Sequence, residues 1–142
     1  MKNHKSIIVG LVLFSVVIAG FFFWPRESTP PVAGVPCLDP DIPILKQHIH
    51  PHLQIISEDK NEEIPANIGL SSDCEKAIHT HDGSGTIHVE AQDSKQYTLG
   101  DFFSVWDKKI DRFGYKLEIN LPGKPEELKL KDKQEIILKY SK

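Results

Sequence analysis

The sequence has no excess of positive charge, and this absence excludes one broad class of function. Its 142 residues carry 17 Lys and Arg against 20 Asp and Glu, a net charge of -3, and no basic run stands out. A surface that binds nucleic acid needs clustered Lys and Arg to neutralise the phosphates. We therefore expect no nucleic-acid partner.

Sulfur is scarce as well. The sequence contains two cysteines, Cys37 and Cys74, and a single methionine, Met1. Because no Cys-x-x-Cys spacing is present, a redox pair or a thiolate metal site is less favoured than one disulfide formed in an oxidising compartment. The lack of thioether and thiolate groups also disfavours a soft copper(I) site.

A long uncharged run occupies the N-terminal part of the chain. Residues 7–24 are without a charge, and such a helix can cross a hydrocarbon core of about 30 Å at about 1.5 Å per residue. Lys2 and Lys5 precede the run, and cationic residues prefer the cytoplasmic side. We predict a cytoplasmic tip at 1–6, a single-pass anchor in the cell membrane at 7–24, and an exported remainder. A cleaved signal peptide is the alternative, although bulky residues 21–24 suit its cleavage site poorly.

The remainder of the chain predicts a tether followed by one domain. Residues 25–36 contain four prolines, which is typical of an extended linker. The extracytoplasmic domain is expected at 37–142, because strand patterns lie on both sides of a single amphipathic helix. The sequence therefore predicts a single small α+β domain with a mainly antiparallel sheet and one covering helix.

Local patterns predict the individual elements of this domain. Thr98 followed by Asp101 has the spacing of a helical capping box, and an apolar stripe follows from Leu99 to Ile110. Alternating apolar residues and turn residues predict strands or hairpin arms. The expected strands or arms are 48–55, 63–68, the two arms of 78–89, 115–121, 128–130 and 136–138. Turns are expected at 58–61 and at 82–85.

Six of the seven histidines lie between positions 48 and 88. His48, His50 and His52 alternate with other residues, so an extended strand would place them on one face with neighbouring Cα atoms about 6.5 Å apart. Two such imidazoles can converge on one cation. Three extended positions span about 13 Å, so we expect one of the three to belong elsewhere.

The second group of histidines lies in the hairpin predicted at 78–89. A tight turn between its arms would place His79 opposite His88, with Ala77 opposite Glu90. The same register would place His81 opposite Thr86. Three imidazoles and a carboxylate would then share one face, and a slip of one residue would separate them.

These side chains predict a metal site, because imidazole and carboxylate together suit zinc and copper(II). The proposed ligands of the zinc or copper ion are His48, His50, His52, His79, His81, His88 and Glu90. The favoured function is a membrane-anchored extracytoplasmic domain for metal handling or sensing. The alternative without a metal is a polar face of the sheet whose histidines titrate with pH and bind no ligand.

Two further classes of function stay open. In a metalloenzyme, three histidines would hold the metal and Glu90 or Asp82 would act as the general base. Because the sequence contains no nucleophile elbow, phosphate loop or cofactor fingerprint, such chemistry would depend on the metal. The other class is a metal-free interaction domain of a membrane complex.

The chain contains three motifs in order: HIHPHL at 48–53, IHTHDGSGTIHVE at 78–90 and TLGDFFSVW at 98–106. Together they resemble an uncharacterised family of small exported or membrane-anchored His-rich proteins of bacteria and archaea. This family has no established activity, so the resemblance implies one domain and supplies no function. A cupin-like barrel is a weaker comparison, because Glu90 follows His81 at a longer spacing than its motif uses.

Overall fold

The computed structural model describes residues 34–142. The architecture below concerns the compact unit that these residues form. The cytoplasmic tip predicted at 1–6, the anchor at 7–24 and most of the tether at 25–36 lie outside the described residues. Within the described range, no helix combines the length and the apolar character needed to span a bilayer.

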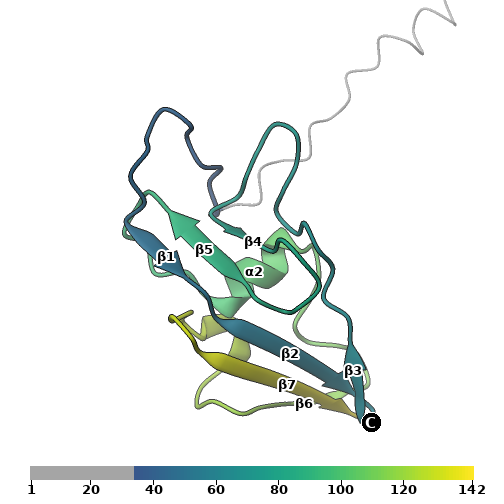
Figure 1. Ribbon diagram of the computed structural model, residues 1–142. Coiled ribbons are helices and arrows are strands. Elements are labelled where there is room, and N and C mark those ends of the chain that lie inside the picture. The colour runs from purple at the N-terminus through teal and green to yellow at the C-terminus, as the bar shows by residue number, and fades with distance from the viewer. Residues whose placement is uncertain (1–33) are drawn as a thin grey trace, which may run out of the picture. The chain divides into compact units, whose positions relative to one another are not determined.

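The described domain has two sheets and one α-helix (Figure 1). The antiparallel three-stranded sheet has the order β1 (Gln47–Ile49), β5 (His88–Ala91), β4 (Ile78–His79). The four-stranded sheet has the order β3 (Lys60–Glu62), β2 (His52–Ser57), β7 (Glu135–Ser141), β6 (Lys116–Ile119). The α+β class is confirmed. The mainly antiparallel pairing is confirmed as well, since only β2 and β7 run parallel among the described strands. The single sheet is wrong, because the strands form two sheets.

Pro51 divides the strand expected at 48–55 into β1 and β2, which belong to different sheets. Proline has no N–H to donate to a strand ladder, and it restricts the conformation of the residue before it. His48 consequently lies in the three-stranded sheet, whereas His52 begins β2 in the four-stranded sheet.

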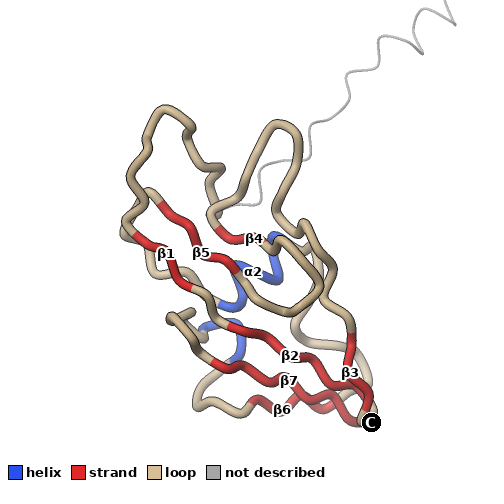
Figure 2. The backbone as a smooth tube through the Cα atoms, in the orientation of Figure 1, coloured by secondary structure: helices blue, strands red, loops and turns tan. Residues whose placement is uncertain are grey.

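The turn between β2 and β3 is tighter than expected. Glu58 and Asp59 have φ values of 50° and 63°, the left-handed conformation that two-residue hairpin turns require. The second arm of the hairpin is therefore β3, and the segment expected as a strand at 63–68 is a loop (Figure 2). Ile64 and Ile68 in this loop are still buried in the core.

The helix begins where its capping box predicts. Thr98 caps α2 (Leu99–Val105), because its side chain accepts from the Asp101 N–H while the Asp101 carboxylate accepts from the Thr98 N–H. The helix packs against β4 and lies behind β4 and β5 in Figure 1. It ends at Val105, so Ile110 reaches the core from the following loop instead.

The remaining strand predictions have mixed outcomes. The pattern at 115–121 forms β6, and 136–138 lies inside β7. The pattern at 128–130 forms only an isolated bridge between Lys129 and Thr98. The short 3-10 helix η1 (Pro125–Glu127) precedes it.

Cys37 and Cys74 are joined by a disulfide, as predicted, across a separation of 37 residues. Closing a loop of this size stabilises the fold by about 4 kcal/mol in the chain-entropy treatment. The bond is flanked by a bridge between Cys37 and Lys76. It therefore holds the start of the domain against the segment that leads into β4.

An ion pair ties β3 to the loop before β6. Arg112 donates to both carboxylate oxygens of Glu62, with 2.8 Å between Nη2 and Oε2. The guanidinium also lies 4.0 Å from the ring centre of Tyr140. Hydrogen bonds from Arg112 hold the pKa of Glu62 below its ordinary value of 4.5.

We expect Glu62→Gln to lower the free energy of unfolding by about 1 kcal/mol at neutral pH, because a partly buried charged hydrogen bond is lost. In the native protein this contribution is present above the unfolded pKa of about 4.5 and is lost as the pH falls below it, since the unfolded chain then binds more protons. Denaturant titrations of the full chain across pH measure both effects. The control is Glu118→Gln, which breaks an exposed pair with Lys116; an equal loss there would contradict the prediction.

Candidate metal centre

Five histidines and Glu90 gather on one face of the three-stranded sheet. His88 and Glu90 alternate with Val89 and Ala91 in β5, so the two pairs point to opposite faces. Val89 and Ala91 are fully buried in the core, whereas His88 and Glu90 keep about a fifth of their side chains exposed, 21% and 20%. The central strand of the sheet thus presents one polar face.

Both neighbours of β5 bring histidines to this face. β4 pairs His79 with His88, which confirms the predicted register, and the Glu90 N–H donates to the Ala77 carbonyl at 2.9 Å. On the other side β1 pairs His48 with Glu90. This second pairing was not predicted, and it joins the two histidine groups of the sequence into one cluster.

The expected pairing of His81 with Thr86 is wrong. β4 ends at His79, and Thr86 forms a bridge with His52 instead. His81 reaches the cluster from the loop that follows β4. The position of this loop is set by Thr80, whose buried side chain donates to the Pro65 carbonyl at 2.9 Å.

A neighbouring loop covers β4 and buries His79. The Lys76 N–H donates to the Gly69 carbonyl at 2.9 Å, and the Thr80 N–H donates to the Ile68 carbonyl at 3.0 Å. Gly69 has a φ of +78°, and a Cβ there would lie 2.6 Å from the Ile78 carbonyl oxygen. Only glycine allows so close an approach, and the side chain of His79 is 0% exposed as a result.

Four ligand atoms converge around His79. One donor atom each from His79, His81, His88 and Glu90 lies within 4.8 Å of all the others. Nε2 of His79 is 3.2 Å from Nε2 of His81, and Nδ1 of His88 is 3.7 Å from Oε1 of Glu90. Tetrahedral bonds of about 2.0–2.1 Å separate ligand atoms by about 3.3–3.4 Å, and square-planar bonds by about 2.8–3.0 Å. The spacing is closer to the tetrahedral arrangement of zinc.

The orientation of His79 is set by a backbone carbonyl. Nδ1 of His79 lies 2.8 Å from the carbonyl oxygen of Lys76. A carbonyl can only accept, so Nδ1 carries the proton and Nε2 of the neutral ring directs a lone pair at His81. Outer hydrogen bonds of this kind orient histidines that ligate metals.

His88 has an unsatisfied polar atom. Its Nδ1 is buried and has no hydrogen-bond partner within residues 34–142, and such an atom costs about 1–3 kcal/mol. Burial lowers the pKa of His88 below its ordinary 6.5, and the neighbouring charges of His81, His50 and His79 lower it further. His88 is therefore held in the neutral form that binds a metal.

His48, His50 and Glu90 form a second group, whose ligand atoms also lie within 4.8 Å of one another. Nε2 of His48 is 3.3 Å from Oε1 of Glu90. The ring centroids of His48 and His50 are 4.7 Å apart, and those of His50 and His88 are 4.8 Å apart. This group is more exposed than the first, with 56% of the His48 side chain open to solvent.

His52 belongs to neither group. Its Nδ1 is 3.1 Å from Oε2 of Glu135, and its Nε2 is 2.9 Å from the carbonyl oxygen of Ser84. Both ring nitrogens therefore point at oxygen atoms of the protein and not at the cluster. His52 therefore leaves the proposed ligand set.

Two acidic residues near the cluster differ from the sequence-based expectation. Asp82 lies in an exposed loop and accepts from the Ser84 N–H at 2.9 Å, and hydrogen bonding by Ser84 lowers its pKa. A lowered pKa makes it a poor general base. Glu75, which was not among the predicted residues, has Oε1 3.6 Å from Nε2 of His79. No periodic pattern marks Glu75, because it lies in the loop before β4.

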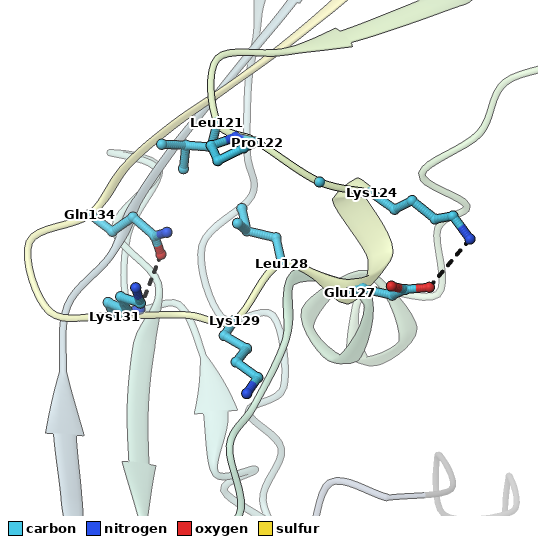
Figure 3. A pocket seen from close by; sticks show the side chains of 9 residues that line it. Leu121, Pro122, Lys124, Glu127, Leu128, Lys129, Lys131 and Gln134 are labelled. Atoms are coloured by element: carbon cyan, nitrogen blue, oxygen red, sulfur yellow. Dashed lines mark hydrogen bonds and ion pairs between the residues drawn. The ribbon is translucent and has the colours of Figure 1, made fainter.

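A surface pocket elsewhere in the domain has no comparable set of ligands. It has a volume of about 370 Å³ and lies between the β6–η1 turn and the segment before β7 (Figure 3). Its walls combine Leu121, Pro122 and Leu128 with lysines, and Lys124 pairs with Glu127 at its rim. None of the histidines lines it.

Comparisons of the chain with protein-family models, with curated proteins and with solved structures find no match. The resemblance to a His-rich family thus rests on the three sequence motifs alone.

In the metal-free full chain, we expect the His88 ring to titrate below pH 6.5, because burial and its histidine neighbours disfavour the cation. NMR titration of the imidazole C–H signals measures this directly. The same shift makes the native state bind fewer protons than the unfolded chain, so stability should fall as the pH drops from about 6.5 toward the native pKa. A His88 titration above 6.5 would contradict the burial argument.

Proposed function

We propose that this chain is a membrane-anchored extracytoplasmic domain that binds zinc or copper(II) for metal handling or sensing. The ligands of the proposed site are His79, His81, His88 and Glu90. One observation carries the proposal. The fully buried His79 donates from Nδ1 to the Lys76 carbonyl, so the lone pair on its Nε2 faces the other three ligand atoms of a group of four that lie within 4.8 Å of one another.

The chemistry of the group favours a cation over a metal-free polar patch. Without a cation, the lone pair of His79 must be satisfied by a proton on Nε2 of His81, and Nδ1 of His88 keeps no partner. A bound metal would satisfy both nitrogens at once. Histidine nitrogen and carboxylate oxygen are established zinc ligands at about 2.0–2.2 Å.

Four protein ligands favour metal handling over catalysis at this site. Catalytic zinc sites generally use three protein ligands and leave the fourth position to water or substrate, whereas structural sites are closed. His79, His81, His88 and Glu90 together would fill a tetrahedral shell. The supply of further histidines beside them, His48 and His50, also suits a protein that collects metal.

Two features support the proposed location. The uncharged run at 7–24 follows Lys2 and Lys5, the arrangement of an anchor whose C-terminal side is exported. The disulfide between Cys37 and Cys74 fits an oxidising compartment. The tether at 25–36 would then keep the metal-binding domain close to its membrane.

Metal binding is tested with the full chain, purified in detergent without a polyhistidine tag. We expect His79→Ala to weaken zinc binding at least about 100-fold, because an oriented ligand is lost. His52→Ala should have little effect, since both its ring nitrogens already have protein partners. Elemental analysis and calorimetric titration measure the stoichiometry and the affinity.

A folding control accompanies this comparison, because His79 is buried. His81 is exposed, so His81→Ala should keep the fold and still weaken zinc binding. Equal affinities of the His52 and His81 variants would contradict the proposed ligand set. A metal-free protein whose melting temperature does not shift on addition of zinc or copper would favour the interaction domain instead.

Topology is tested with C-terminal reporter fusions in a bacterial host. We expect alkaline phosphatase at the C-terminus to be active, because that enzyme needs an oxidising compartment for its disulfides. Deletion of 7–24 should abolish the activity, and a cytoplasmic reporter should give the reciprocal pattern. An active cytoplasmic reporter on the full chain would overturn the exported location.

A further inference from the structure

The proposed site leaves two adjacent histidines unexplained. His48 and His50 are not in the group around His79, yet their ligand atoms lie within 4.8 Å of a carboxylate oxygen of Glu90. Glu90 is therefore the one residue that belongs to both groups. Its Oε1 is 3.3 Å from Nε2 of His48 and 3.7 Å from Nδ1 of His88.

We infer that Glu90 bridges two metal ions and that the histidine face is a dinuclear centre for zinc or copper(II). This inference rests on the proposed function, because the first ion is the one held by His79, His81, His88 and Glu90. The second ion is held by His48, His50 and the shared carboxylate. A carboxylate has two oxygens and about four lone-pair directions, so it can ligate two cations at once.

The fold fixes Glu90 between the two groups. It lies on the central strand β5, with His48 directly opposite on β1 and its own N–H bonded to Ala77 beside β4. Its side chain is 20% exposed. The carboxylate is thus positioned by the sheet and not by a flexible loop.

The two groups are contiguous. Ring contacts run without interruption from His48 to His50, from His50 to His88, and onward to His81 and His79, with centroid separations of 4.5–4.8 Å along this path. Two cations in adjacent groups would repel each other strongly unless anionic ligands lay between and beside them. Glu90 lies between the groups.

Two more carboxylates flank the ends of the cluster. Glu75 has Oε1 3.6 Å from Nε2 of His79, and Asp132 has Oδ1 3.9 Å from Nδ1 of His50. Asp132 also accepts from the backbone N–H of His50 at 3.0 Å, which positions that residue beside Pro51. Together with Glu90, these groups supply the negative charge that a second divalent ion requires.

The two positions should differ in strength. The first ion would have three imidazoles, including a fully buried one, whereas the second would have two partly exposed imidazoles and one shared carboxylate. Three protein ligands leave a coordination position for solvent or an exogenous ligand. We therefore expect ordered filling, with a tight first ion and a weaker, open second ion.

The test is a titration of the metal-free full chain with copper(II) or zinc, followed by elemental analysis and, for copper(II), electron paramagnetic resonance. The background carries His4→Ala to remove the one histidine outside the described residues. We expect two ions per chain. The second equivalent of copper(II) should replace the mononuclear spectrum by that of a coupled pair, because the two spins share a carboxylate bridge.

Two variants isolate the second site. The double variant His48→Ala, His50→Ala should bind one ion with the first affinity retained, and these two side chains are exposed enough for the fold to persist. Glu90→Gln should lose the spin coupling. The matched control, His52→Ala, should keep two coupled ions.

Each result decides one of the two proposals. One ion in both the parent chain and the double variant would overturn the dinuclear centre and leave the proposed function intact. Two ions without spin coupling would overturn the bridging role of Glu90. Binding of no ion by the parent chain would overturn the proposed function itself.

Discussion

The pairing of β5 with a strand on each side is the constraint on which the candidate centre depends. Glu90 is opposite His48 through β1, and His88 is opposite His79 through β4. The residues between them on β5 face the core, so the register cannot slip by one residue without exposing apolar side chains and burying charge. Hydrophobic burial on one face of the sheet therefore holds the imidazoles and the carboxylate together on the other.

Backbone contacts bury and orient His79 on this face. The Lys76 carbonyl that orients His79 belongs to the segment which the disulfide ties, through Cys74, to the start of the domain. The disulfide therefore restrains the segment that carries this carbonyl. The loop bearing Gly69 completes the enclosure by packing against β4.

Features encoded by neighbouring residues could be predicted from the sequence. The capping box of Thr98 and Asp101 marked the start of α2, and the alternation around the Asp82 loop predicted the pairing of His79 with His88. Two cysteines without a Cys-x-x-Cys spacing predicted their disulfide. Each of these depends on contacts between close neighbours or on the absence of any other partner.

The α+β class, the supply of histidines and the local register of their second group were all predictable from patterns of residues. The separation of His48 and His52 into different sheets at Pro51, the pairing of β1 with β5, and the position of Glu90 between two sets of imidazoles became apparent only in the folded domain. The reason is physical. Pairing between distant strands depends on which apolar faces the whole chain can bury together. It therefore cannot be predicted from a local pattern of residues.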